Sequence, residues 1–314
     1  MTFRPGRLLG LVLTACLVLA GCATSDPTAP STAAPTGGST AGATVVRVGS
    51  ANFGESEIIA ELYAQALEAK GVTVERTMQI GARDVYIAAL IDGSVDLVPE
   101  YTGNLLQYFD AEATAKTPDE VTAALAAAVP PGMVVLTPAA AEDKDSYNVT
   151  KEFSETNGVT SLADLAGYSG TLRVGGLPEL AERPYGPQGL TSVYGVPADR
   201  IEFVPIADGG GPLTVQALVD GDVELANIFS TTPAIVENGF VTLADPQNMI
   251  VPQNVVPLLS ERVATSEVTE VLEAVSAELT TADLLAMNGR NSGDEKASPA
   301  DIAADWLTEK GLGS

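Results

Sequence analysis

A nine-residue pattern occurs twice in the chain, and this repetition constrains the fold more than any other feature. Residues 89–97 read ALIDGSVDL and residues 217–225 read ALVDGDVEL, at a constant offset of 128 residues. Each copy has the form of a helix that ends at a glycine and is followed by a buried strand. Although many helix–glycine–strand units look alike, two similar copies so far apart suggest two similar lobes. The same offset places Tyr101 on Phe229, so each lobe would carry an aromatic residue at the end of the corresponding strand.

Short apolar runs and amphipathic helices alternate around both copies. We expect strands at residues 45–49, 72–78, 95–99, 172–176, 200–205 and 223–228. We expect helices at residues 55–70, 84–91, 189–194, 214–220, 267–279 and 299–310, the last capped by Ser298. Strand–helix–strand order with short connections predicts parallel pairing in α/β sheets. Ligands of such sheets bind beyond the carboxyl ends of the strands, so Tyr101 and Phe229 would both point into a cleft.

The first residues of the chain have the features of a bacterial export signal. Arg4 and Arg7 form a basic start, and the apolar run of residues 8–20 is shorter than the ~20 residues that a spanning helix needs. The sequence LAGC, which ends at Cys22, resembles the lipobox of bacterial lipoproteins, in which cleavage leaves a lipid-carrying cysteine. We therefore expect a signal peptide at residues 1–21 and lipidation of Cys22. An ordinary signal peptide with a chance cysteine is the alternative.

A segment of small residues follows the predicted signal peptide. Residues 22–44 are mostly alanine, threonine, serine, glycine and proline, and they contain no large apolar side chain. Such a segment cannot bury enough surface to fold, which predicts a flexible tether. The protein would then be anchored by lipid to the cell membrane, on its extracytoplasmic face.

The composition excludes several classes of function. The formal net charge is −25, which excludes nucleic-acid binding because phosphate contacts need clustered lysine and arginine. The chain has no histidine, and its two cysteines are Cys16, inside the predicted signal peptide, and Cys22, directly after it. The glycine-rich residues 208–211 lack the phosphate-binding patterns and predict a turn. The sequence therefore predicts no catalytic residue, no cofactor and no metal site.

Several residues at predicted strand ends suit a small solute. Tyr101, in PEYTG, offers a π face to a cation and a hydroxyl group to an acceptor. Residues 50–56, in which Ser50 and Asn52 are candidate helix caps, would expose backbone N–H groups suited to an anion. Arg183, in PELAERPYG, could hold a carboxylate through two hydrogen bonds. Ordinary structure explains each feature singly, but together they favour a solute-binding cleft.

Two longer segments resemble a known family. VGSANFGESEIIAELYAQALEAKG (residues 48–71) and ALIDGSVDLVPEYTGNLL (residues 89–106) are similar to the substrate-binding lipoproteins of ABC importers for compatible solutes. The resemblance is to the ProX/OpuC type, which takes glycine betaine, choline and related quaternary amines, and it extends from Val45 to the end of the chain. It implies two α/β lobes of the type II periplasmic-binding-protein fold, joined by two hinge crossovers.

The resemblance also implies the domain boundaries and the partners. Lobe one would comprise residues 45–138 and 253–314, and lobe two residues 139–252, with crossovers near residues 138–143 and 244–252. The cleft would close around the ligand, and the monomeric receptor would then dock on a membrane permease driven by a separate ATPase.

In betaine-binding members of this family, tyrosines surround the quaternary ammonium group and an arginine with other donors holds the carboxylate. The positions that match the tyrosines hold Tyr101, Tyr147, Phe229 and Gln253. Other ligand-binding candidates are Asn52, Asn104, Asp145, Glu179 and Arg183, and the loop position often occupied by lysine holds Ala51. Because two tyrosines are replaced, a different polar or aromatic ligand is an alternative.

Two further classes of protein remain open at this point. An enzyme on the same fold would need an acid–base pair in the cleft, and the absence of histidine disfavours it. A sensor would dock its closed form on a signalling partner in place of a permease.

Overall fold

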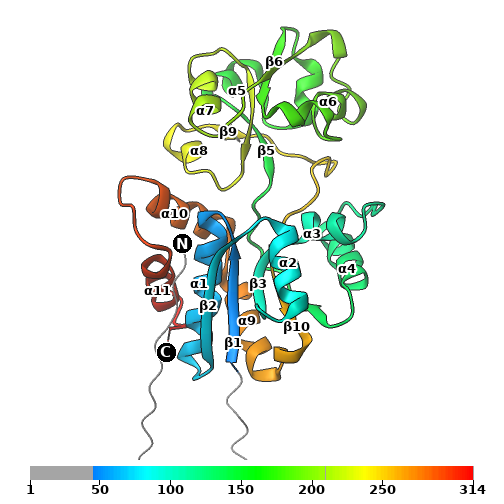
Figure 1. Ribbon diagram of the computed structural model, residues 1–314. Coiled ribbons are helices and arrows are strands. Elements are labelled where there is room, and N and C mark those ends of the chain that lie inside the picture. Colours follow the sequence, from blue (N-terminus) through cyan, green and yellow to red (C-terminus); the bar gives the residue numbers. More distant parts are fainter. Residues whose placement is uncertain (1–44, 209, 314) are drawn as a thin grey trace, which may run out of the picture. The chain divides into compact units, whose positions relative to one another are not determined.

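The computed structural model describes residues 45–208 and 210–313 (Figure 1). The predicted signal peptide, Cys22 and the predicted tether lie outside the described residues. Within the part of the chain that is described, none of the helices combines the length and the apolar character needed to cross a membrane.

The first of two five-stranded sheets has the strand order β2-β1-β3-β10-β4. Its strands are β1 (Val45–Ala51), β2 (Thr73–Gly81), β3 (Leu97–Tyr101), β4 (Met133–Val135) and β10 (Val255–Ser260). The helices of this lobe are α1 (Gly54–Ala69), α2 (Arg83–Asp92), α3 (Thr102–Phe109), α4 (Pro118–Ala128), α9 (Ser266–Glu278), α10 (Thr281–Ser292) and α11 (Pro299–Glu309), with the 3-10 turn η4 (Glu261–Val263).

Helices cover this sheet in two layers (Figure 1). Helix α1 contacts β1 and β2 on one side and α9, α10 and α11 on the other, so its side chains are buried almost all round. Ile58 and Leu62 are fully buried there, and each such side chain contributes roughly 1.5–3 kcal/mol of hydrophobic stabilisation. Helices α2, α3 and α4 pack in a separate apolar cluster with Val98 and Leu258. The lobe is therefore a three-layer α/β/α structure.

The second sheet has the strand order β7-β6-β8-β5-β9. Its strands are β5 (Asp145–Val149), β6 (Leu172–Gly176), β7 (Ile201–Pro205), β8 (Leu225–Phe229) and β9 (Val241–Thr242). The helical segments are α5 (Lys151–Asn157), η1 (Leu162–Gly167), η2 (Pro178–Glu182), α6 (Pro187–Ser192), η3 (Ala198–Arg200), α7 (Pro212–Val219) and α8 (Ala234–Glu237). The predicted strands and helices are present in both lobes, with ends displaced by at most a few residues.

The repeated sequence pattern forms the same local structure in both lobes. Strand β3 and strand β8 occupy matching positions at the offset found in the sequence, and α2 and α7 precede them. Each helix is followed by a glycine with positive φ, 79° at Gly93 and 73° at Gly221, a conformation that residues with a Cβ adopt rarely. Tyr101 and Phe229 are therefore the last residues of equivalent strands, which confirms the prediction of two similar lobes.

Strand pairing is parallel where it was predicted, but each sheet also contains an antiparallel strand that the sequence analysis missed. The pairs β1–β2, β1–β3, β6–β7 and β6–β8 are parallel. Strand β10 pairs antiparallel to β3, and β5 pairs antiparallel to β8. These two strands directly follow the crossovers, so the chain enters each sheet from its ligand-binding end.

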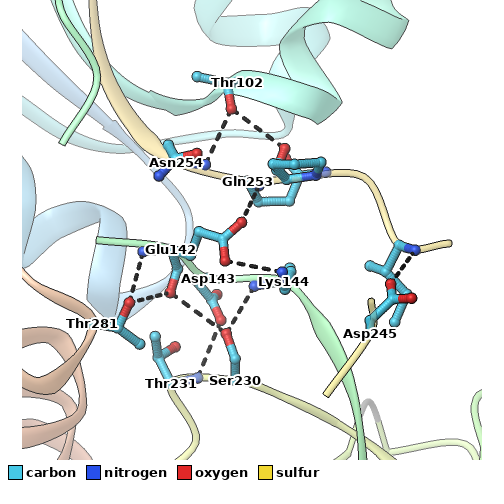
Figure 2. A network of polar contacts seen from close by, with 12 residues as sticks. Thr102, Glu142, Asp143, Lys144, Ser230, Thr231, Asp245, Gln253, Asn254 and Thr281 are labelled. Carbon is cyan, nitrogen blue, oxygen red and sulfur yellow. Dashed lines mark hydrogen bonds and ion pairs between the residues drawn. The ribbon is translucent and has the colours of Figure 1, made fainter. Parts of the chain in front are cut away.

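The two crossovers are bonded to each other near these entry points (Figure 2). Glu142 and Asn254 form an antiparallel bridge, and Oε1 of Glu142 accepts a hydrogen bond from the Gln253 backbone N–H at 3.2 Å. Thr102 Oγ1 accepts from the Asn254 N–H at 3.1 Å, which joins the second crossover to the start of α3. Lys144 Nζ lies 2.9 Å from Oε2 of Glu142.

One predicted helix cap is present and two are not. Ser298 accepts a hydrogen bond from the backbone N–H of Asp301 and caps α11. The N-cap of α1 is Phe53, without a side-chain hydrogen bond, so the predicted capping by Ser50 and Asn52 is wrong. The reason is that β1 continues to Ala51, which leaves Ser50 inside the strand, where its Oγ accepts from the Gln79 N–H at 2.8 Å.

Gly103, the glycine of the PEYTG motif, lies where α3 meets the second crossover. A Cβ atom at this position would lie 2.5 Å from the carbonyl oxygen of Pro252 and 2.8 Å from Gln253 Nε2 and from Val251 Cγ1. The backbone oxygen cannot be displaced without moving the crossover. The motif therefore requires a glycine for close packing.

We expect Gly103→Ala to lower the free energy of unfolding by about 1–3 kcal/mol, as overpacking of a tight contact does. Gly167→Ala is the matched control, because a Cβ at Gly167 would meet no atom within 4 Å. Denaturant unfolding of both variants measures the effect, and equal stability of Gly103→Ala and the wild-type protein would contradict the packing argument.

Candidate functional site

A mostly apolar hollow of about 380 Å³ lies beside the ends of β1, β3 and β8. It is lined by Ala51, Phe53, Ser56, Arg83, Tyr86, Pro99, Tyr101, Asn104, Asp143 and Phe229. In lobe one these residues come from β1, β3 and the helices α1, α2 and α3, with Phe53 directly before α1. The others come from the first crossover and from the end of β8 in lobe two. Tyr101 and Phe229, which occupy equivalent positions in the sequence repeat, thus line the same cavity.

Aromatic rings form much of this lining. Phe53 and Tyr101 are stacked, with ring centroids 6.3 Å apart and planes inclined by 28°. Phe229 is 40% exposed, whereas Tyr101 is 8% exposed. The π faces of such rings attract a cation most strongly where water is excluded.

Tyr101 is held by a chain of hydrogen bonds that includes a buried carboxylate. Its hydroxyl group donates to Glu55 Oε1 at 2.6 Å, and Glu55 Oε2 accepts from Asn288 Nδ2 at 2.5 Å. The same Asn288 nitrogen lies 3.2 Å from the backbone oxygen of Thr231 in lobe two. Burial, together with the charge of Glu55, raises the pKa of Tyr101 well above its ordinary value. The tyrosine therefore remains a neutral hydrogen-bond donor.

Asp143 lies in the wall of the cavity on the first crossover, where Figure 2 shows it pointing toward Thr231. Its Oδ1 accepts from the Thr231 N–H at 3.3 Å. Burial and the neighbouring Glu55 raise the pKa of Asp143 to about 8. At neutral pH this carboxyl group is therefore largely protonated in the unliganded protein.

A second hollow of about 150 Å³ shares Asn104 and Phe229 with the first. Its other lining residues are Asp145, Leu177, Glu179, Leu180, Arg183, Tyr185 and Asn227. The guanidinium carbon of Arg183 lies 6.0 Å from the centre of the Tyr185 ring, and the Tyr185 hydroxyl group donates to Asp145 Oδ2 at 2.8 Å. Three of the predicted polar residues, Asp145, Glu179 and Arg183, thus lie together.

Gln253 is engaged with Asn104. Its Oε1 accepts from the Asn104 N–H at 2.9 Å, and its Nε2 donates to Asn104 Oδ1 at 3.0 Å. Both residues line a narrow third hollow of about 40 Å³ that joins the residues around Asp143 to those around Arg183. The amide of Gln253 therefore fixes the first turn of α3 rather than standing free in the cavity.

Two residues predicted for the site lie elsewhere. Tyr147 is 1% exposed in the core of lobe two, where its hydroxyl group donates to the backbone oxygen of Tyr185 at 2.8 Å. It is absent from the lining of the three hollows described above, and Tyr185 occupies the lining beside it. Asn52 is exposed and is also absent from these linings.

Four residues that line the site are not among those predicted from the sequence. These are Phe53, Tyr86, Asp143 and Tyr185. The Tyr86 hydroxyl group donates to buried Glu100 at 2.7 Å, and Tyr86 also lines the cavity. Phe53 lies in the segment of residues 50–56, for which only the backbone N–H groups were predicted to bind a ligand. The sequence signal that could have identified Phe53 is an aromatic residue next to a glycine just after a strand.

The residues described in the structure contain no group of side chains arranged to hold a metal ion. The lining offers aromatic faces, carboxyl groups, amides and the guanidinium group of Arg183, which forms no ion pair with any residue of the described part of the chain. Such a lining can bind a small polar solute.

Comparison with known proteins identifies the family. The sequence model of the substrate-binding domain of ABC-type glycine betaine transport systems matches residues 44–309. The chain belongs to this family. Relatives of this receptor include the glycine betaine-binding protein YehZ of Escherichia coli (strain K12), 28% identical over 281 residues that cover 86% of this chain and 92% of YehZ. A glycine-betaine-binding protein of Pseudomonas aeruginosa is 26% identical over 288 residues, which cover 86% of this chain and 89% of the relative.

Solved structures are similar to the receptor over the same range. The apo structure of YehZ from Escherichia coli has a TM-score of 0.73 at 26% identity and covers 86% of this chain and 100% of YehZ. A glycine betaine/carnitine/choline ABC transporter structure has a TM-score of 0.77 at 20% identity, with 86% and 100% coverage, and shows the shared fold. The receptor is therefore a two-lobed binding protein of this family, as the resemblance implied.

The raised pKa of Asp143 predicts a pH-dependent difference in stability. Between the ordinary pKa of 3.8 and the folded-state pKa of about 8, the folded protein binds more protons than the unfolded chain. The stabilising contribution of the group is therefore complete at low pH and is lost as the pH rises to about 8. We expect Asp143→Asn to unfold with a higher free energy than wild type at pH 8, by an amount on the order of a few kcal/mol, because the raised pKa means that the folded state disfavours the charged carboxyl group.

The difference in unfolding free energy between Asp143→Asn and wild type should shrink toward pH 4, because the wild-type carboxyl group is then neutral in the folded protein and largely neutral in the unfolded chain. Chemical unfolding across this range measures the difference. Asp294→Asn is the control, because Asp294 is exposed and carries the same charge. A stability difference that does not vary with pH would contradict the assignment.

Proposed function

We propose that this receptor binds a quaternary-amine solute of the glycine betaine or choline kind outside the cytoplasm and delivers it to an ABC permease. The observation that carries this proposal is the cavity of about 380 Å³ between Phe53, Tyr101 and Phe229. Its volume lies near the lower end of the roughly 300–1,000 Å³ range of small-molecule sites, which suits a compact solute.

The chemistry of the lining supports a cation as the buried group. A trimethylammonium group cannot accept or donate conventional hydrogen bonds, so it gains most from aromatic faces and nearby negative charge. Phe53, Tyr101 and Phe229 supply the faces, and the carboxyl groups of Glu55 and Asp143 lie behind and beside Tyr101. Two relatives are named as glycine betaine-binding proteins, which agrees with this chemistry.

The second hollow offers a place for the other end of the solute. Arg183 can donate two parallel hydrogen bonds to a carboxylate, and Asn104 can donate to a carboxylate or a hydroxyl group. Gln253, whose identity suggested a different ligand, is accounted for by its hydrogen bonds to Asn104.

We further propose that the receptor is a lipid-anchored monomer whose lobes close by bending at the two crossovers. The LAGC sequence supports acylation of Cys22, and the small residues 22–44 support a flexible tether between the lipid and β1. The single chain supplies both lobes of the site, so no second copy is needed to complete it.

Removing one aromatic wall should weaken binding of a quaternary amine. We expect Phe53→Ala and Phe229→Ala each to reduce the affinity about tenfold, because a cation–π contact contributes about 0.5–2 kcal/mol. Tyr108→Ala is the matched control: Tyr108 is 42% exposed, close to the 43% of Phe53 and the 40% of Phe229, but does not line the cavity.

Calorimetry of residues 45–314 with glycine betaine, choline, carnitine and proline betaine measures these affinities. The proposal is wrong if none of these amines binds while another class of solute does. It is also wrong if the three alanine variants bind equally well.

Lipid anchoring predicts a change in fractionation. The full-length Cys22→Ala variant should lose the acyl group, whereas Cys16→Ala should retain it, because Cys16 lies inside the predicted signal peptide. Metabolic labelling with a fatty acid, followed by membrane flotation, measures both. Labelling that persists in Cys22→Ala would contradict the proposed anchor.

A further inference from the structure

The cavity wall carries an excess of carboxyl groups. The acids that line the three hollows are Asp143, Asp145 and Glu179, and the bases are Arg83, Lys144 and Arg183. Two of the bases are already neutralised by acids outside the lining: Arg83 Nε lies 2.7 Å from Glu100, and Lys144 Nζ lies 2.9 Å from Glu142. Three acids therefore face the solute with a single available guanidinium group.

The positions of these groups differ. Arg183 lines the second hollow together with Asp145 and Glu179, so its charge is locally compensated. Asp143 lines the first hollow, beside the aromatic rings, and buried Glu55 lies behind Tyr101 in the same wall. Among residues 45–208 and 210–313, no lysine or arginine forms an ion pair with Asp143 or Glu55.

A cation at the aromatic rings would be the missing counter-charge. Asp143 reaches the cavity from the crossover backbone, and its position is fixed by the hydrogen bond from the Thr231 N–H at 3.3 Å. The same wall repels a negative group, because like charges in a partly desolvated site raise the free energy of the complex. A solute that carries only a positive charge therefore gains more from this wall than a zwitterion does.

We propose that Asp143 is a specificity-determining residue that makes this receptor favour carboxylate-free quaternary ammonium alcohols, such as choline, over zwitterionic betaines. This inference rests on the proposed function, because it assumes that a quaternary amine occupies the first hollow. Beyond the proposed function, it says which chemical group of the solute the charges of this chain favour: the quaternary ammonium group and not a carboxylate.

The protonation of Asp143 supplies a signature for this role. The groups that face it are Glu55 from α1, Tyr101 from β3, Asp145 from β5 and the backbone of Thr231. Burial and Glu55 raise its pKa, and a bound cation favours the charged form and so lowers it again. Choline binding near neutral pH therefore releases protons, and the affinity for choline rises with pH up to about 8. The carboxylate of a betaine opposes this field, so its binding releases fewer protons.

The test compares choline and glycine betaine by calorimetry on the wild-type receptor, Asp143→Asn and Asp294→Asn, at pH 6 and pH 8.5. Asparagine keeps an acceptor for the Thr231 N–H and removes only the charge. At pH 8.5 we expect Asp143→Asn to lose about tenfold in choline affinity and less than about threefold in glycine betaine affinity, the size of effect that one lost charge-assisted contact produces.

At pH 6 the loss in choline affinity should be smaller, because Asp143 is then protonated in the wild-type protein. Titrations in two buffers of different ionisation enthalpy count the released protons, and Asp143→Asn should abolish the release. Asp294→Asn should behave as wild type in every measurement, because Asp294 is exposed and outside the linings.

The outcomes separate the two proposals. If both amines bind but Asp143→Asn changes them equally, or changes neither, the specificity role is wrong and the receptor function stands. If the wild-type receptor favours glycine betaine at pH 8.5, the specificity role is also wrong. If neither amine binds, the proposed function fails, and the specificity role fails with it.

Discussion

Each sheet of this receptor is entered by a crossover directly beside the strand that carries a cavity aromatic, and the binding site depends on this pairing. Val255 pairs with Tyr101 at the start of β10, and Asp145 pairs with Phe229 at the start of β5. The backbone hydrogen bonds of these antiparallel pairs fix the crossovers against β3 and β8. Gln253 and Asp143, each two residues before such a pair, are thereby carried to the cavity.

The electrostatics of the site follow from the same arrangement. The first crossover brings Asp143 close to Glu55, and neither carboxyl group has a basic partner among the described residues. Burial disfavours the charged form of Asp143, and the neighbouring Glu55 adds a like charge, so both effects raise the pKa of Asp143. A lining of aromatic rings and uncompensated carboxyl groups is suited to a permanent cation that cannot form hydrogen bonds.

The sequence predicted the parts of the fold that repeat locally and missed those that depend on distant pairing. The helix–glycine–strand pattern was enough to equate Tyr101 with Phe229, because a helix that ends near a glycine with positive φ and is followed by a buried strand leaves a local signature. Strands β10 and β5 were missed because they are defined by their antiparallel partners. Asp143 could not be identified from sequence, since nothing in its neighbourhood distinguishes it from the many other acids of the chain. The sequence could not show that Tyr185, and not Tyr147, lines the second hollow. The packing of lobe two decides this, because it buries Tyr147 against the backbone of Tyr185.

Asp143 belongs both to the wall of the cavity and to the first crossover (Figure 2). Any change in the dihedral angles of this crossover displaces the Asp143 carboxyl group in the cavity wall, and any change in its protonation alters the hydrogen bond that it accepts from Thr231. At Asp143, the contacts with the solute and the conformation of the crossover backbone therefore change together. An affinity measured for this receptor is a composite of contact energy and the free energy of rearranging the crossover, and the two can be distinguished only by varying each at the same position.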